Sequence, residues 1–600
     1  MRTHAKRIAV AVFLTAGLAI IGAFLALPEG IALGPNYTVA KTPYGKLKGY
    51  ETEELIIWKG VPYAKPPVGE LRWRPPQDPE PWEGVRDAIS PAQKCTQLLT
   101  TTEWIRTGSV DPESGEDCLY LDICRPKRPG YRKERLPVYV WIHGGSNNFG
   151  SARDYDASEL AFRSNLVVVV IQYRLGPMGW FYHPAVQTGG LDPLADSGNF
   201  GTLDHMQALK WIRHNITAFG GDPKRVTITG ESAGGHNVMN LVISPLSKGL
   251  FQRAMSQSGG MTTKSTSYAR NLANTTIERV IRLLEGLDQT QATQRRIEME
   301  NDGTLDAYLR NIDAGTFFRA IITYGSIGTY DGIEDGVVIP LGGWIPAIRA
   351  GIYNKVPIIL GSNEYETKSF MPLYGMTVKA LYGVPSGSYS WFNLLDVLKG
   401  RSKPDGTPFT LDDVLPTDLD RNTYEIAGYY GSRTWKAKFV DTVAHELVQQ
   451  QPNVYAYLFK WGGIGSGPSP FDFIYGAGHA GEIAFFFGWD HGLFGYPFVP
   501  ENEKGRKELQ QAMMRYLSNF ARTGNPNSKR QGLPKWEKWS NDASGPKAIV
   551  FDADFENAQI SMSNEELTIE GVRLELEEAL EGLPENYRNT AWFFQWHAPW

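Results

Sequence analysis

A serine flanked by glycines, placed directly after a short strand pattern, is the feature that most constrains this chain. Residues 230–234 read Gly-Glu-Ser-Ala-Gly and fit the pattern Gly-x-Ser-x-Gly. Before them Val226 and Ile228 alternate with threonines, as in a strand, and small and apolar residues follow, as in a helix. A serine on so sharp a strand-to-helix turn has its hydroxyl held clear of the sheet. The segment therefore predicts a nucleophilic Ser232 and directs the search to a base and an acid.

The composition is that of a large globular protein with no charge pattern for nucleic acid. With 600 residues, 42% of them hydrophobic, the chain can bury a large core. The net charge is −5 and no dense basic block occurs, so nucleic-acid binding has no electrostatic support. No clean linker divides the chain. We therefore predict one catalytic domain over residues 35–600, preceded by an N-terminal targeting segment over residues 1–34.

The N-terminal segment is basic and then apolar. Arg2, Lys6 and Arg7 precede twenty uncharged residues, 8–27, which are long enough to span a bilayer of about 30 Å as a helix. Residues 30–32, Gly-Ile-Ala, offer a small-x-small cleavage site. A cleaved signal peptide and a retained anchor both stay open, and a buried core helix is disfavoured. Either reading predicts export, as a secreted or periplasmic protein or one attached to the membrane through residues 8–27.

Three cysteines occur, and two of them are expected to pair. Export favours oxidation. A bond between Cys95 and Cys118, which have 22 residues between them, would stabilise the fold by about 3 kcal/mol in the loop-entropy model. Cys124 follows a strand-like run and is expected to be a buried free thiol. No Cys/His cluster has metal-site spacing, so no metal is expected.

Alternating apolar and helical segments indicate the fold class. Helix-like stretches such as residues 203–216 separate the strand-like runs and predict an α/β protein, with a large, mostly parallel central sheet flanked by helices. Segments 268–330 and 371–434 are expected to be helical insertions that cap this sheet. Ligands of such sheets bind at the carboxyl ends of the strands. The strand-like runs are residues 138–142, 166–171, 226–229, 358–360 and 454–458.

A base for Ser232 is sought among the histidines that follow it, because the α/β-hydrolase order is serine, acid, histidine. His236 is one helical turn beyond the serine and would point away from it. His445 lies in a helical pattern and is expected at the surface or in packing. His479 stands in a loop of small residues, 476–481, that can present an imidazole without crowding a substrate. His479 is therefore the favoured base, with the other histidines open. The histidines after Ser232 are His236, His445, His479, His491 and His597.

Further motifs are spread along residues 40–600. They are Trp-Lys-Gly-Val-Pro-Tyr-Ala at 58–64, Leu-Arg-Trp at 71–73 with Pro-Pro at 75–76, Glu-Asp-Cys-Leu-Tyr-Leu at 116–121, Gly-Asn-Phe-Gly at 198–201 with Asp204, Phe-Gly-Gly-Asp-Pro at 219–223 and Thr-Gly-Asn-Pro-Asn at 523–527. Together with the serine turn they resemble the type-B carboxylesterases, which include cholinesterases and some fungal lipases. The resemblance implies an α/β-hydrolase fold and a serine carboxylic-ester hydrolase that needs no metal or organic cofactor.

The resemblance places the three catalytic positions. The nucleophile falls on Ser232 and the histidine on His479. The acid falls on Glu366, in the Gly-x-Asn-x-x-Glu stretch of residues 361–366. Glu364 is its rival, and a solvated loop carboxylate is the ordinary alternative for a glutamate. Thr367 stands where the family usually has glycine, so a tighter turn after the acid is expected.

The resemblance also implies an oxyanion hole of backbone N–H groups. Its donors would be Gly145, Ser146 and Ala233. Ser146 replaces the third glycine of the family's turn, and its side chain adds bulk and a hydroxyl beside the acyl group. Glu231 resembles a buried glutamate that biases the field around the triad, and Ser258 resembles a hydroxyl near the acid–base pair. A purely structural role stays open for both.

The substrate is less constrained. Trp104 lies between the paired cysteines, but its spacing differs from that of the choline-binding tryptophan of cholinesterases, so a packing or rim role is favoured. The aromatic run 485–489 fits either an apolar approach to the site or core packing. We predict hydrolysis of small-molecule or lipid esters, with a lipase for long acyl chains as the alternative. A non-catalytic adhesion protein is disfavoured because all three triad positions are filled. The oligomeric state is not specified.

Overall fold

The protein is described here by a computed structural model. It describes residues 38–100, 106–128, 134–260, 262–325, 328–462, 470–492, 498–529 and 532–597. The predicted targeting segment, residues 1–34, and Trp104 lie outside these ranges. Among the residues that are described, no helix is long and apolar enough to cross a membrane.

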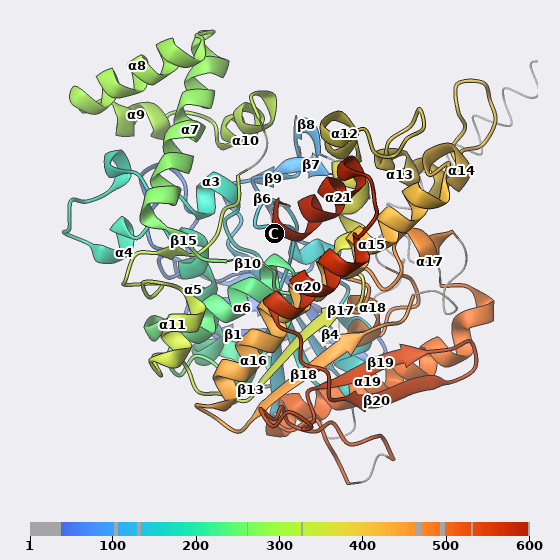
Figure 1. The fold of residues 1–600 in the computed structure, drawn as a ribbon. Helices are drawn as coiled ribbons and strands as arrows, with labels where there is room; N and C mark the ends of the chain where they lie inside the picture. The colour runs from blue at the N-terminus through green and yellow to red at the C-terminus, as the bar shows by residue number, and fades with distance from the viewer. Residues whose placement is uncertain are drawn as a thin grey trace, which may run out of the picture.

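An 11-stranded mixed sheet runs through the molecule (Figure 1). From β12 to β19 in the order given below, neighbouring strands are parallel, and the strands at both edges are antiparallel. The prediction of a mostly parallel central sheet is confirmed. The spatial order is β20 (Ala558–Ser563), β19 (Ala548–Ala553), β18 (Val454–Phe459), β17 (Ile358–Asn363), β14 (Arg253–Gln257), β13 (Gly221–Glu231), β11 (Leu136–Ile142), β12 (Val167–Ile171), β10 (Tyr120–Pro126), β4 (Leu55–Pro62) and β3 (Tyr50–Glu51).

Both faces of the parallel centre of this sheet are buried, as parallel sheets require. Every residue of β11 is buried, and successive side chains belong to different hydrophobic clusters. The cluster of Val140 is covered by α5 (Phe200–Asn215) and α6 (Ala233–Ile243), and that of Trp141 by α19 (Glu503–Thr523). A continuous apolar run therefore forms a strand here because helices pack on both of its sides.

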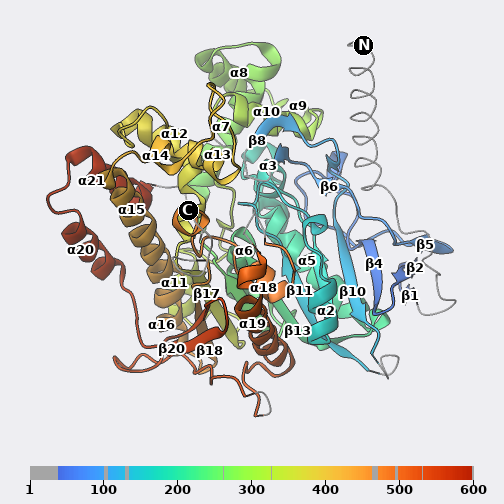
Figure 2. The ribbon, with the colours of Figure 1, turned by 90° about the vertical axis from the view of Figure 1, so that its right-hand side faces the viewer.

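Two groups of helices lie over the sheet, and in both views most of them gather at one end of the molecule, whereas α15 and α20 extend down its side (Figures 1 and 2). One group follows β14 and the other follows β17, as the predicted cap insertions do. The second group has a hydrophobic core of its own, shared with helices near the C-terminus. The helices are α7 (Thr266–Glu285), α8 (Gln289–Asn301), α9 (Leu305–Arg310) and α10 (Ala314–Thr323), then α12 (Met371–Tyr382), α13 (Leu394–Leu398), α14 (Leu411–Val414) and α15 (Asp418–Lys436), with α20 (Ile569–Ala579) and α21 (Glu585–Trp592) near the C-terminus.

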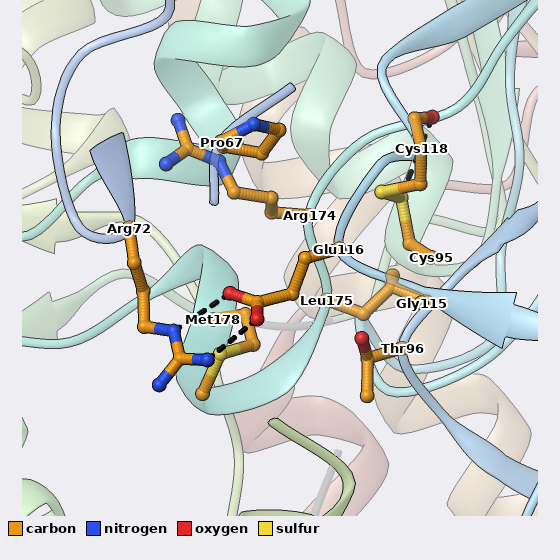
Figure 3. A pocket seen from close by; sticks show the side chains of 10 residues that line it. All are labelled: Pro67, Arg72, Cys95, Thr96, Gly115, Glu116, Cys118, Arg174, Leu175 and Met178. Carbon is orange, nitrogen blue, oxygen red and sulfur yellow. Dashed lines mark hydrogen bonds and ion pairs between the residues drawn. A yellow bond between two sulfur atoms is a disulfide. The ribbon is translucent and has the colours of Figure 1, made fainter. Parts of the chain in front are cut away.

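A disulfide joins Cys95 to Cys118, as predicted, and Cys124 is a buried free thiol in β10. Next to this bond, Arg72 forms a two-pronged ion pair with Glu116, at 2.7 and 2.5 Å (Figure 3). The Arg72 guanidinium also donates to the carbonyl oxygen of Ile312, at 2.7 Å, between α9 and α10. The disulfide-closed loop is thereby tied to the first cap group, around a cavity of about 10 Å³.

Candidate active site

Ser232 occupies a sharp turn between β13 and α6. Its backbone has φ 58° and ψ −126°, a conformation that costs energy for any residue except glycine. The glycines around it are required by close approach. A Cβ added to Gly234 would lie 2.0 Å from the carbonyl oxygen of Ile142, and one added to Gly230 would lie 2.6 Å from the same atom. The strand–turn–helix setting predicted for Ser232 is thus present.

His479 and Glu366 are fully buried and in contact. Glu366 Oε2 lies 2.5 Å from His479 Nδ1, and Glu366 Oε1 accepts a 2.6 Å hydrogen bond from the N–H of Asn363. The rival acid, Glu364, instead forms a 2.8 Å ion pair with Lys460. The fold therefore brings Glu366, and not Glu364, to the imidazole.

Two loops carry this pair, and backbone hydrogen bonds join them. The N–H of Tyr365 donates to the carbonyl oxygen of Ala477, at 2.9 Å. The side chain of Asn363 donates to the carbonyl oxygen of Gly478, at 2.7 Å. The loop after β17 and the loop of His479 consequently hold each other in register, which fixes the distance between acid and imidazole.

The other ring nitrogen of His479 faces Glu231. Its Nε2 lies 3.0 Å from Glu231 Oε1. Within the described ranges, no hydrogen bond joins the Ser232 hydroxyl to the ring. Such bonds are often long in enzymes without substrate and tighten when substrate binds. Glu231 is therefore placed to compete with Ser232 for the nitrogen that a nucleophilic serine needs.

Glu482 is a third buried carboxylate beside the histidine, and the sequence did not single it out. Its Oε1 accepts hydrogen bonds of 3.3 Å from the hydroxyls of Ser258 and Tyr457, and its Oε2 accepts one of 2.6 Å from Asn363. Ser258 is thus joined to the acid–base pair only through Glu482 among the contacts of the described residues. The missed residues, Asn363 and Glu482, stand inside the two motif stretches, Gly-x-Asn-x-x-Glu and Gly-His-Ala-Gly-Glu. A polar residue at a fixed place in each motif was the available signal.

The carboxylates control the charge of the imidazole. Burial disfavours the charged ring, but the carboxylates of Glu231 and Glu366 outweigh burial and raise the pKa of His479 to about 10. Burial also raises the pKa of Glu231. Burial and the two neighbouring carboxylates raise the pKa of Glu482 to about 8. The buried carboxylates therefore stabilise the charged form of the His479 ring.

A tight turn after β11 lies against the serine. Gly145 has φ 96° and Ser146 has φ 54°. A Cβ added to Gly144 would lie 3.1 Å from Ser232 Cβ, so the two turns touch. In the described part of the chain, the N–H groups of Gly145 and Ser146 donate to no protein group. Ala233 begins α6, where N–H groups have no partner within the helix. Within the described part of the chain, these three N–H groups are therefore available to bind an oxyanion.

Asn147 holds this turn in place from behind. Its backbone is also left-handed, with φ 56°, which asparagine tolerates better than most residues. Its side chain donates to the carbonyl oxygen of Tyr330, at 2.9 Å, and accepts from Asn237 of α6, at 2.8 Å. The turn is therefore tied both to the helix that follows Ser232 and to the segment after α10.

Thr367 follows Glu366 in a single 3-10 turn, Glu366–Ser369, and packs against α15. Its hydroxyl donates to the carbonyl oxygen of Gly428, at 2.7 Å, and its N–H donates to the hydroxyl of Ser432, at 3.1 Å. A Cβ added to Gly431 would lie 2.9 Å from the Thr367 methyl group. The glycine-lined face of α15 thus accommodates the threonine, which anchors the acid's loop to the second cap group.

The other candidate histidines lie elsewhere. His236 Nε2 is 2.6 Å from Asp331 Oδ1 in a separate buried pair, and His445 pairs with Glu566 at 2.8 Å. The aromatic run 485–489 is buried in the core, so packing explains it. No group of three or more His, Cys, Asp and Glu side chains among the described residues is arranged to hold a metal ion.

Sequence similarity to known proteins shows which family the chain belongs to. The model of the carboxylesterase family matches residues 36–568. Mouse carboxylesterase 1E is 32% identical over 533 residues, which cover 83% of this chain and 86% of the mouse protein. The chain belongs to the carboxylesterase family. It is a carboxylic-ester hydrolase with an α/β-hydrolase fold, as the sequence motifs predicted.

Two further similarities bear on this carboxylesterase. A duck protein named fatty acyl-CoA hydrolase precursor, medium chain, is 33% identical over 531 residues, with 84% of this chain and 86% of the duck protein covered. The crystal structure of the Geobacillus stearothermophilus carboxylesterase EST55 at pH 6.2 superposes with a TM-score of 0.64 at 27% identity, covering 88% of this chain and 98% of that one. The fold is therefore shared over nearly the whole length of a solved carboxylesterase.

Proposed function

We propose that the protein hydrolyses esters through an acyl-enzyme formed on Ser232, with His479 as the base and Glu366 as the acid that orients it. The observation that carries this proposal is the buried 2.5 Å contact of Glu366 with His479, in loops adjoining the serine turn. A serine hydroxyl needs a neighbouring base to attack a carbonyl at neutral pH, and an imidazole held by a carboxylate supplies one.

The reaction proceeds in two halves. When an ester binds, the Ser232 hydroxyl attacks its carbonyl carbon and passes its proton to His479 Nε2. Glu366 keeps the proton on Nδ1 and stabilises the charged ring. His479 then returns the proton to the departing alcohol. In the second half His479 takes a proton from water as the water attacks the acyl carbonyl, the bond to the Ser232 oxygen breaks, the proton passes to that oxygen, and the carboxylic acid leaves. The residues thus balance every proton without a metal or an organic cofactor.

The N–H groups of Gly145, Ser146 and Ala233 bind the negative oxygen that forms at the carbonyl. Each such donor contributes about 3–4 kcal/mol to transition-state stabilisation. The support for these roles is that the turn of Gly145 touches the turn of Ser232 and that its N–H groups have no described protein partner.

Changing Glu231 to Gln is expected to move the pH profile to lower pH. The Glu231 carboxylate raises the pKa of His479, and the amide keeps its size but removes its charge. A base works only when neutral, so a lower pKa extends activity into more acidic solution. We expect the apparent pKa of the acidic limb of the kcat/KM profile to decrease by about 1 unit, which corresponds to about 1.4 kcal/mol. The measurement is a pH-stat profile with a butyrate ester.

The control is Glu364→Gln, which changes the ion-paired glutamate two residues before the triad acid. It should leave the acidic limb of the pH profile unchanged. An unchanged limb in Glu231→Gln, or one moved to higher pH, would contradict the role given to Glu231.

The preferred ester is proposed to be a general carboxylic ester of short or medium acyl chain. The name of the duck relative, a medium-chain fatty acyl-CoA hydrolase, supports acyl groups in this range. We expect kcat/KM for p-nitrophenyl esters to be highest between butyrate and octanoate, measured from acetate to palmitate with Ser232→Ala as the blank. A maximum at palmitate, with activation at an oil–water interface, would instead assign a lipase. Rates equal to the blank throughout would reject ester hydrolysis.

Export is proposed as the setting for this activity. A disulfide between buried cysteines is typical of proteins that fold in an oxidising compartment. The duck relative is named a precursor, which fits a secretory route. Cleavage or retention of the segment that includes residues 8–27 is tested by N-terminal sequencing of the mature protein.

A further inference from the structure

Arg106 stands beside the candidate oxyanion turn and has no counter-ion among the residues that the structure describes. It begins β8 (Arg106–Val110), which pairs with β7 (Leu98–Thr100) in the disulfide-closed loop. Its guanidinium lies 5.2 Å from the ring centroid of Phe149. Phe149 closes the turn of Gly145, because its N–H donates to the Gly145 carbonyl oxygen at 3.2 Å. One aromatic ring therefore separates a cation from the oxyanion donors.

The cap faces the other side of this cation. Burial raises the pKa of the Tyr374 phenol, in α12, to about 12, and the charge of Arg106 opposes that rise. Figure 1 shows β7 and β8 at the end of the molecule where α10 and α12 gather. Arg106 thus lies between Phe149 of the oxyanion turn and Tyr374 of the second cap group.

The guanidinium of Arg106 differs from several buried arginines of this chain in having no carboxylate partner among the described residues. Three buried arginines are paired with carboxylates: Arg72 with Glu116, Arg174 with Asp204 and Arg296 with Glu278. Arg106 has no hydrogen bond or ion pair with any residue that the structure describes, and its Nε is buried and unpartnered. Burial lowers the pKa of its guanidinium to about 10. A desolvated charge without a partner is costly, and an anion would relieve that cost.

We infer that Arg106 binds a carboxylate carried by the ester substrate, several bonds away from the scissile carbonyl. The inference rests on the proposed function of Ser232. A guanidinium presents a planar fork of donors that matches a carboxylate, and its partial desolvation strengthens that bond. The substrate class is then the half-ester of a dicarboxylic acid, or an ester whose alcohol carries an acid group. Phe149, stacked on the guanidinium, holds the fork open toward such a group.

The test compares charged and neutral esters of equal length. The acyl-side pair is the mono-p-nitrophenyl ester of adipate and p-nitrophenyl hexanoate, and the alcohol-side pair is 4-carboxyphenyl hexanoate and phenyl hexanoate. We expect the ratio of kcat/KM, charged over neutral, to fall about 10-fold in Arg106→Gln for at least one pair, with the neutral ester unaffected. Arg106→Lys should lose less, and the wild-type preference should weaken as salt increases.

A matched control is Arg86→Gln, which removes an exposed arginine that also lies over an aromatic ring, that of Trp82. Its ratios should equal those of the wild type. Unchanged ratios in Arg106→Gln for both pairs, or an equal loss on neutral esters, would overturn the inference. Should Arg106→Gln not fold, the same ratios for Arg106→Lys and the salt dependence of the wild type decide it. A wild type that hydrolyses no ester at all would reject the proposed function instead.

Discussion

Replacing Ser232 by alanine is expected to lower kcat for p-nitrophenyl butyrate by about 10⁵-fold or more, because the residue that forms the acyl-enzyme is lost. KM should change little, since the oxyanion turn and the cap helices still bind the ester. The backbone at this position is left-handed in either case, with φ 58°, so the substitution adds no new strain. Initial rates on purified protein, with active-site titration, measure the effect.

The control for this loss is Ser267→Ala, which changes an exposed serine on α7. It should retain wild-type kcat. Melting temperatures within about 2 °C of the wild type for both variants would show that the fold is intact, since 1 kcal/mol shifts the midpoint of a large domain by roughly that much. A Ser232→Ala protein that keeps more than a tenth of the wild-type kcat would contradict the assignment.

Changing Glu366 to Gln is expected to lower kcat by about 10⁴-fold, the loss seen when a triad acid is replaced by its amide. The amide group can donate to His479 Nδ1, where the carboxylate accepts from it at 2.5 Å. The ring then carries its proton on Nε2 and cannot take the one from Ser232. The variant should fold normally because the amide fills the same buried space.

Glu364→Gln is the matched control for Glu366→Gln. The two glutamates lie two residues apart in the same loop, but Glu364 pairs with Lys460 and not with the imidazole. We expect kcat of Glu364→Gln within a factor of three of the wild type. If Glu364→Gln lost activity and Glu366→Gln kept it, the acid would be Glu364.

The sequence predicts the central sheet well because its strands are buried on both faces. The runs at 138–142, 166–171 and 454–458 are continuous in apolar residues, and such runs have few alternatives to a central strand. β14 (Arg253–Gln257) escaped notice because three of its five residues are polar, although two of these, Ser256 and Gln257, are buried. β20 did so because it is an edge strand in which no residue is fully buried.

Within the site, the motif residues could be predicted from the sequence. The contact by which Glu231 competes with Ser232 for the His479 ring could not. Ser232, Glu366 and His479 stand in short patterns with fixed spacing, and Glu364 could be set below Glu366 on that ground. Glu231 and His479 are nearly 250 positions apart in the sequence, yet Glu231 Oε1 lies 3.0 Å from His479 Nε2. This contact depends on how the chain turns after β13. The packing of Thr367 likewise could not be predicted. Its side chain fits against glycines of α15, and that space exists only when α15 packs against the loop of Glu366.

The central claim, an acyl-enzyme on Ser232, is tested most directly by covalent labelling. A p-nitrophenyl alkylphosphonate mimics the ester and leaves a stable phosphonyl group on the attacking oxygen. Intact-protein mass spectrometry followed by peptide mapping should find one adduct per chain, on Ser232, with activity lost in proportion. Ser232→Ala should stay unlabelled under the same conditions. Labelling of another residue, or equal labelling of Ser232→Ala, would contradict the mechanism.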